Sequence, residues 1–164
     1  MPCAAFLLPP DVFELVYGDE CLKAIGAQSI LISEKPLGSH EPGPDWLDRL
    51  SGVEVLFTGW HSPRLDDRFL QKLPNLRAVF HAGGTIRPLV SEAFWARAIP
   101  ITTASAANAV PVAEFTLAAI LLALKQAWML NRTICRDRAF PKTLPHVPGA
   151  RGSTVGLVSL GLIG

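Results

Sequence analysis

Three features of the sequence predict an α/β fold built on a parallel sheet. Short apolar runs recur along the first two thirds of the chain, segments of helical character separate them, and Pro- or Gly-containing turns close them. Strands of a parallel sheet read as short apolar runs because crossover helices cover both faces. Right-handed crossovers then give a doubly wound, flavodoxin-like layout.

Five strands are expected, at residues 4–8, 29–32, 53–57, 77–80 and 100–103. Between them, helical segments are expected at 11–25, around 46–50, at 67–73 and at 91–97, where Ser91 and Glu92 are typical of a helix start. Ligands of such sheets bind outside the carboxyl ends of the strands. A site is therefore expected in the loops after Leu8, Phe57, Phe80 and Thr103.

The sequence of the last third of the chain predicts the beginning of a second domain. Residues 112–130 read as a long helix that is apolar almost all round, so we expect it to be buried between two bodies. The polar, Pro-containing stretch 131–152 follows, and then a strand from Thr154 that runs into a glycine turn. The expected organisation is a flavodoxin-like substrate-binding domain at 1–105, then an interdomain helix and the start of a Rossmann domain at 106–164.

Composition excludes several classes of partner. The net charge of +1 gives no electrostatic basis for binding nucleic acid or an anionic membrane. The uncharged run between Glu114 and Lys125 is well short of the ~20 residues that span a bilayer. No signal peptide is recognisable, and the scattered Cys3, Cys21 and Cys135 suit a reducing, cytoplasmic location. The histidines lack metal-ligand spacing, so no metal site is expected.

A dinucleotide fingerprint stands at the end of the chain. The pattern Ser159-x-Gly161-x-x-Gly164 is G-x-G-x-x-G with serine in the first position. In this motif the second glycine lets the backbone approach the pyrophosphate, and the third allows close packing of helix on strand. If the first position requires a positive φ, serine costs roughly 1–2 kcal/mol there. An ordinary glycine turn after a buried strand is the alternative.

A small-residue loop follows the fourth expected strand. The run Ala82-Gly83-Gly84-Thr85 exposes successive backbone N–H groups, which can bind a carboxylate without a charged side chain. A simple strand-terminating turn is the alternative. His81 lies beside this loop, although a packing role is commoner for a histidine at a strand end. His61 and Arg87 either line the same cleft or face solvent.

The segment before the long helix also has two interpretations. Asn108 either caps that helix or presents its amide to a ligand, and capping is the commoner use. Pro111 is suited to the first turn of a helix. Glu114 would complement the macrodipole there.

These motifs, in this order, resemble the D-isomer-specific 2-hydroxyacid dehydrogenases. The stretches 76–85, 98–102 and 108–117 are similar to that family's substrate loop, fifth strand and interdomain helix. Residues 154–164 are similar to its cofactor turn. The resemblance spans most of the chain, with three departures: Thr85 stands where the family usually has glycine, Arg87 where it has an acidic residue, and Ser159 where it has glycine.

The resemblance implies an NAD- or NADP-dependent oxidoreductase that reduces 2-oxo acids or oxidises D-2-hydroxy acids. The loop of Ala82, Gly83, Gly84 and Thr85 would hold the substrate. The cofactor-binding residues would be Asn108, Val112, Ser159, Gly161 and Gly164.

The resemblance also implies that the family's catalytic arginine, carboxylate and histidine would follow Gly164, so the chain alone is expected to be inactive. A homodimer through the interdomain helix region is expected. Two alternatives remain, a non-catalytic dinucleotide-binding or protein-interaction relative on the same fold, and a free-standing flavodoxin-like module.

Overall fold

The computed structural model describes residues 1–38, 50–143 and 146–164. The chain forms two compact units, Met1–Ala106 and Ala107–Gly164. The helix expected around 46–50 lies almost entirely outside the described residues.

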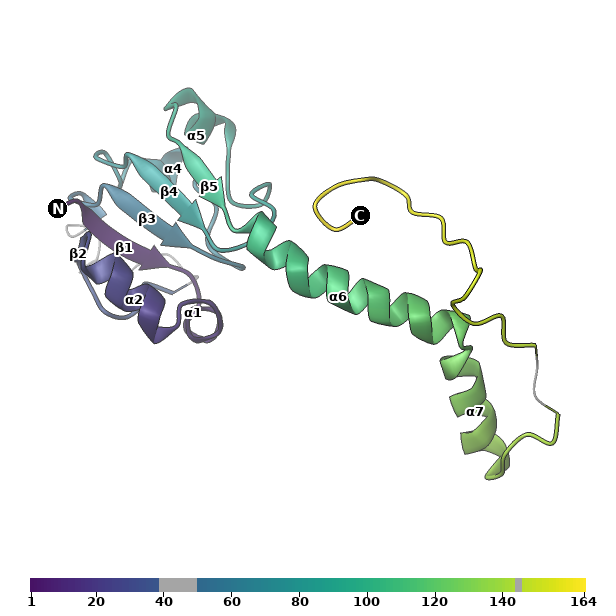
Figure 1. Ribbon diagram of the computed structural model, residues 1–164. Coiled ribbons are helices and arrows are strands. Elements are labelled where there is room, and N and C mark those ends of the chain that lie inside the picture. Colours follow the sequence, from purple (N-terminus) through teal and green to yellow (C-terminus); the bar gives the residue numbers. More distant parts are fainter. Residues whose placement is uncertain (39–49, 144–145) are drawn as a thin grey trace. The chain divides into compact units, whose positions relative to one another are not determined.

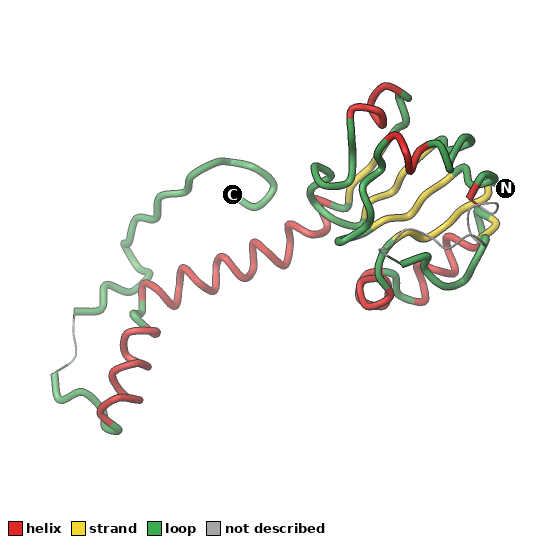
Figure 2. The backbone as a smooth tube through the Cα atoms, turned by 180° about the vertical axis from the view of Figure 1, so that it is seen from behind, coloured by secondary structure: helices red, strands yellow, loops and turns green. Residues whose placement is uncertain are grey.

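The first unit is a five-stranded parallel sheet, which confirms the predicted fold class (Figure 1). Its strands lie in the order β2-β1-β3-β4-β5, seen side by side in Figure 2. The strands are β1 (Cys3–Leu7), β2 (Ile30–Leu31), β3 (Val55–Thr58), β4 (Ala78–His81) and β5 (Ile101–Thr103). This order is that of the flavodoxin-like doubly wound sheet.

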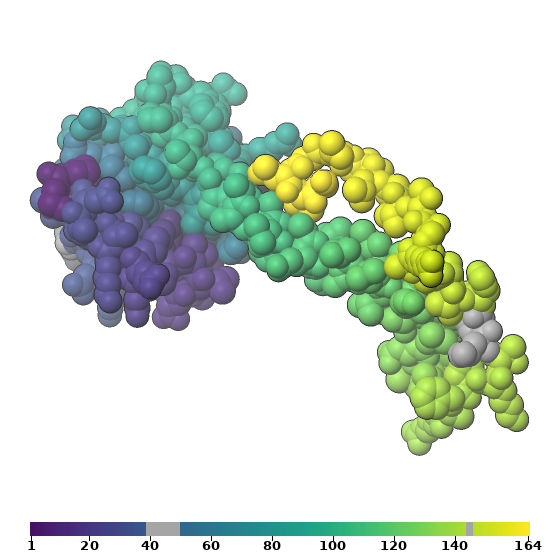
Figure 3. Space-filling view, viewed as in Figure 1, coloured from purple at the N-terminus to yellow at the C-terminus, as the bar shows by residue number. Residues whose placement is uncertain are grey.

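Helices cover the two faces of this sheet. Helices α1 (Pro10–Val16) and α2 (Asp19–Gly26) lie on one face, where an apolar cluster is built on the buried Phe6, Leu8, Val12 and Tyr17. Helices α4 (Asp67–Leu70) and α5 (Glu92–Ala96) lie on the other, over a larger cluster that includes Leu56 and Val79. Figure 3 shows these residues as a close-packed body, coloured purple to teal.

The starts of the two helices on the larger cluster are set by their capping side chains. Ser91 Oγ accepts a hydrogen bond from the N–H of Phe94, as predicted for the start of α5, and Asp66 does the same for Phe69 at α4. The single amphipathic segment expected at 11–25 is instead two helices, because Tyr17 and Gly18 leave helical geometry between them.

The second unit differs from its prediction in where the helices begin. Helix α6 spans Ser105–Leu124 and α7 spans Ala127–Asp137, with Gln126 in the left-handed conformation between them. Because α6 begins at Ser105, Asn108 is inside the helix and does not cap it, and neither Pro111 nor Glu114 is in the first turn. The Ala-rich run before Pro111 favours helix strongly enough to extend it in the N-terminal direction.

The expectation that the long helix is buried was wrong for the part of the chain that the structure describes. Ala109 is the only buried residue of α6, and Phe115 is 75% exposed. An apolar helix is buried only where other elements pack on several of its sides. Among the described residues, α6 alone is long and apolar enough to cross a membrane, a test of length and composition that core helices of soluble proteins also pass.

The strand expected from Thr154 is absent from the described residues. Residues 154–164 form bends without ladder pairing, and Val158 and Leu160 are 100% and 87% exposed. A buried strand requires neighbours for its backbone hydrogen bonds and for both faces, and no strand of the described chain pairs with this segment. The polar stretch expected at 131–152 begins inside α7.

Truncating a buried leucine should destabilise the fold far more than truncating an exposed one. Leu56 is fully buried in β3, so Leu56→Ala is expected to lower the free energy of unfolding by about 2–5 kcal/mol. The same change at Leu15, which is 76% exposed on α1, should alter it by less than about 0.5 kcal/mol. Urea unfolding followed by tryptophan fluorescence measures both variants, and equal losses would contradict this assignment of the core.

Candidate functional site

The register of the sheet brings the carboxyl ends of four strands into one row. Thr58 of β3 is the register partner of Leu7 on one side and of His81 on the other, and His81 is the partner of Thr103. Each strand therefore ends at the same edge of the sheet. The loops that follow β1, β3, β4 and β5 emerge there together, as the sequence predicts for a ligand site.

Buried polar side chains join the ends of β3 and β4. Thr58 is fully buried, and its Oγ1 lies 3.0 Å from Nδ1 of His81 and 3.3 Å from the carbonyl oxygen of Phe80. The Tyr17 hydroxyl donates a hydrogen bond of 3.1 Å to the carbonyl of Thr58. Burial is the main cause that raises the pKa of Tyr17, with the nearby Cys21 second, so the phenol is neutral and available as a donor.

Sequence reasoning did not identify Thr58 and Tyr17 as part of this edge. The available signal was a polar residue at the end of a buried strand, Thr58 in the run Val55-Leu56-Phe57-Thr58. Such a group must find partners inside the protein. Ser62 was missed as well: its Oγ accepts from the N–H of Gly59 at 2.9 Å and donates to the carbonyl of Leu7 at 2.6 Å.

His81 is the buried histidine of this edge. It is 5% exposed, and within the described residues its Nε2 has no hydrogen-bond partner. Burial lowers the pKa of His81, and the backbone of Thr85 partly offsets that effect. The ring is therefore neutral near pH 7, because desolvation disfavours the imidazolium.

The loop after β4 has free backbone donors. The N–H of Ala82 is already bonded to the carbonyl of Thr58 at 2.9 Å. The N–H groups of Gly83, Gly84 and Thr85 have no acceptor among the residues that the structure describes. Three successive unsatisfied N–H groups are suited to an anion, so the donors of this loop begin at Gly83 and not at Ala82.

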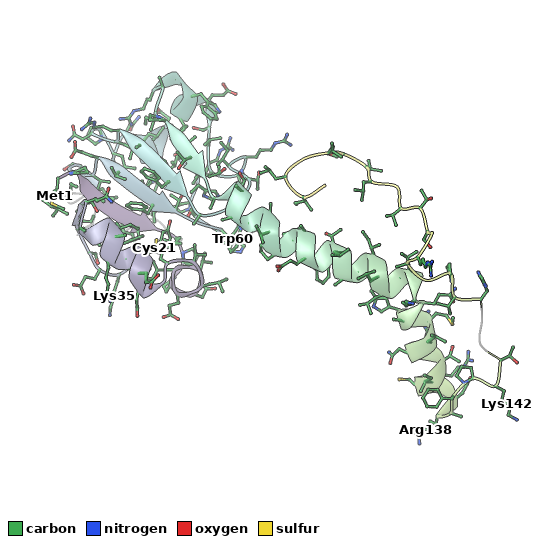
Figure 4. The ribbon with its side chains drawn as sticks, viewed as in Figure 1. Met1, Cys21, Lys35, Trp60, Arg138 and Lys142 are labelled. Carbon is green, nitrogen blue, oxygen red and sulfur yellow. The ribbon has the colours of Figure 1, made fainter. Side chains whose placement is uncertain are left out.

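Glycine is required at position 83 by a close approach. A Cβ there would lie 2.6 Å from Nε2 of His81 and 3.2 Å from Nε1 of Trp60. Trp60 is 38% exposed and lies near the carboxyl ends of the strands, as labelled in Figure 4. The loop, the imidazole and the indole therefore pack together at one point.

The other residues singled out by sequence are more exposed. His61 is exposed and has a φ of 62°, in the left-handed region that costs a non-glycine residue about 1–2 kcal/mol. Arg87 is exposed as well. Neither has a contact that assigns it to the site.

The predicted cofactor residues all belong to the second unit. Asn108 and Val112 lie four residues apart on α6 and so share one face of that helix. Ser159 has a φ of 77°, the conformation for which glycine is preferred. Because residues 154–164 form neither a strand nor a helix start, the described chain does not build the phosphate cradle that the fingerprint predicts.

A groove of about 540 Å³ lies away from the predicted site. It is lined in part by Glu54, Val55, Arg77 and Ala78, at the amino ends of β3 and β4. Arg77 Nη1 bonds Glu54 Oε1 at 3.0 Å, and this hydrogen bond is the main cause that lowers the pKa of Glu54. None of the predicted site residues lines this groove.

Two solved structures share the fold of this chain. One is a phosphoglycerate oxidoreductase from Rhizobium etli, 19% identical, with a TM-score of 0.59 over 94% of this chain and 46% of that chain. The other is an NADPH-dependent glyoxylate/hydroxypyruvate reductase from Sinorhizobium meliloti in complex with citrate, 20% identical, with a TM-score of 0.60 over 99% of this chain and 47% of that chain. The sequence matches no protein-family model and no curated protein.

These neighbours belong to the D-isomer-specific 2-hydroxyacid dehydrogenases, the family that the sequence resembles. At these identities the likeness establishes a shared fold. The chain spans about half the length of each neighbour.

The close approach at Gly83 gives a direct test of the loop geometry. Gly83→Ala places a methyl group against Nε2 of His81, so we expect the free energy of unfolding to fall by about 1–3 kcal/mol. Gly26→Ala is the matched control, because a Cβ at that helical position meets nothing within 4 Å. Denaturant unfolding of both variants measures the difference, and an unchanged Gly83→Ala protein would contradict the packing described here.

Proposed function

We propose that the whole protein is an NAD(P)-dependent oxidoreductase that interconverts 2-oxo acids and D-2-hydroxy acids. In this proposal the Met1–Ala106 unit supplies the substrate contacts. The observation that carries the proposal is the row of three free N–H groups at Gly83, Gly84 and Thr85, beside a buried neutral histidine. Both fold neighbours are, by name, oxidoreductases or reductases of small organic acids or their phosphates.

The loop fits a carboxylate for reasons of charge and space. The three N–H groups supply positive partial charge without a cation, and the loop has no carboxylate side chain to repel an anion. Trp60 gives the loop a half-exposed apolar wall. A 2-oxo acid, with one carboxylate and a small remainder, suits such a place.

The hydride would come from a nicotinamide dinucleotide, whose chemistry the protein orients and does not itself supply. In the proposal, Asn108 and Val112 face the nicotinamide side of the cleft, and Ser159, Gly161 and Gly164 hold the pyrophosphate. The described residues do not form that cradle, so we assign no step to it. Catalytic acid, base and arginine groups are assigned to sequence after Gly164.

The exposed face of α6 supports the further proposal that two copies associate through this helix. Val110, Leu117, Leu121 and Leu122 are each at least 42% exposed. Exposed apolar faces of this kind mark sites of association. A cytoplasmic location is proposed from the three free cysteines.

A catalytic assay tests the proposed function. We expect a longer product of the same reading frame to consume NADH or NADPH with a panel of 2-oxo acids that includes glyoxylate, hydroxypyruvate and pyruvate. The 164-residue chain should give no turnover under the same conditions, because the residues that the structure describes form no cofactor cradle.

Two outcomes would contradict these expectations. Failure of the longer product with every acid and both cofactors would leave the non-catalytic dinucleotide-binding or protein-interaction relative as the better account. Turnover by the 164-residue chain itself would contradict the assignment of the catalytic groups to later sequence.

A further inference from the structure

The groove of about 540 Å³ lies between helix α2 and one face of the sheet. Its floor consists of two register pairs of strand residues, Val55 with Ala78 and Phe57 with Phe80. Alternate residues of a strand share a face, so these four lie opposite Leu56 and Val79, which pack in the larger apolar cluster. One wall is a stripe at the spacing i, i+3 and i+4 on α2, made of Cys21, Ala24 and Ile25.

The described part of the Met1–Ala106 unit leaves this face uncovered over β4 and β5. Helices α1 and α2 pack over the cluster of Phe6 and Phe57, while α4 and α5 both pack on the opposite face. Phe80 is accordingly 43% exposed, and its register partner Thr102 is exposed as well. Parallel sheets are covered on both faces, so an exposed apolar part of one is a candidate binding surface.

The floor of the groove is aromatic. The rings of Phe57 and Phe80 are stacked, with centroids 5.4 Å apart and an interplanar angle of 21°. Phe6 and Tyr17 contact the Phe57 ring from the core, so Phe80 is the exposed end of a packed row of rings. Aromatic pairs prefer offset-stacked or edge-to-face arrangements and gain from them beyond their buried area. A flat aromatic ring therefore suits this floor better than an aliphatic chain does.

The amino end of the groove offers hydrogen-bond donors to an anion. The Arg77 side chain is 76% exposed and bonds Glu54 Oε1 through Nη1 at 3.0 Å. Glu54 Oε2 accepts the N–H of Cys3 at 3.2 Å, so both oxygens of this carboxylate are engaged. Among the described residues, Nε and Nη2 of Arg77 have no partner. A guanidinium has five N–H donors, and Arg77 therefore retains donors for a second carboxylate.

We propose that this groove binds a small aromatic carboxylic acid, with its ring over Ala78 and Phe80 and its carboxylate on the free N–H groups of Arg77. The groove volume of about 540 Å³ falls within the range of small-molecule sites, about 300–1,000 Å³. The groove lies at the amino ends of β3 and β4, whereas the 83–85 loop follows the carboxyl end of β4. The inference is therefore independent of the proposed function.

Amide NMR of the intact 164-residue chain, titrated with 2-naphthoate, tests the proposal. We expect the amides of Ile25, Phe57, Ala78 and Phe80 to shift with one midpoint, while the amide of Gly84 stays in place. 2-Naphthol has the same rings without the carboxylate and should bind the groove more weakly. Oxamate has a carboxylate without a ring and should leave the groove amides unchanged.

Two variants separate the contribution of the charge from that of the groove. Arg77→Gln should weaken 2-naphthoate about fivefold, the effect of an exposed ion pair, and leave 2-naphthol unchanged. Arg87→Gln, an exposed arginine outside the groove, is the matched control and should change neither. Ala24→Trp fills the groove from α2 and should abolish binding of both compounds, whereas Leu15→Trp on the exposed side of α1 should not. Circular dichroism checks that each variant is folded.

Four results would overturn the proposal. The first is no response of the groove amides to 2-naphthoate, and the second is full affinity for it in folded Arg77→Gln. The third is movement of the same amides on dilution of the ligand-free protein, which would identify a second copy of the chain as the occupant. The fourth is a response in the 164-residue chain that is absent from a longer product of the reading frame, which would show that later sequence covers the groove.

Discussion

The parallel register of the sheet is the constraint on which the candidate site depends. It places four residues in one row across neighbouring strands: Leu7, Thr58, His81 and Thr103. The row exists because both faces of the sheet are anchored by apolar side chains, Phe6 and Leu8 toward α1 and α2, Leu56 and Val79 toward α4 and α5. Shifting one strand by a single residue would exchange its two faces, so the packing that stabilises the sheet also fixes where its loops begin.

Polar side chains join two neighbouring strands at the end of this row. Thr58 lies within hydrogen-bond distance of the His81 ring, and Tyr17 bonds the Thr58 carbonyl, so the ends of β3 and β4 are tied together inside the core. The loop after β4 then leaves the sheet with its next three N–H groups unsatisfied. Gly83 allows that loop to lie against the imidazole. The ends of the strands thus hold this run of backbone donors beside the imidazole, and preorganised donors of this kind can stabilise an anion.

The sequence predicts the first unit far better than the second. Strands β1, β3, β4 and β5 are recognisable within one or two residues, because each is a short apolar run bounded by turn residues. The start of α6 was misplaced because Pro111 was taken as a first-turn residue. The strand predicted from Thr154 is absent from the described residues because a local apolar pattern cannot form a ladder without neighbouring strands. The contacts of Thr58 and the unpartnered Nε2 of His81 depend on tertiary register, which no local pattern encodes.

The central claim is that small acids bind at the carboxyl ends of β3 and β4. A crystal structure of the protein grown with oxamate tests it most directly. The account predicts a carboxylate within hydrogen-bond distance of the N–H groups of Gly83, Gly84 and Thr85. Oxamate found instead in the groove beside Glu54 and Arg77, at the opposite ends of the same strands, would contradict it.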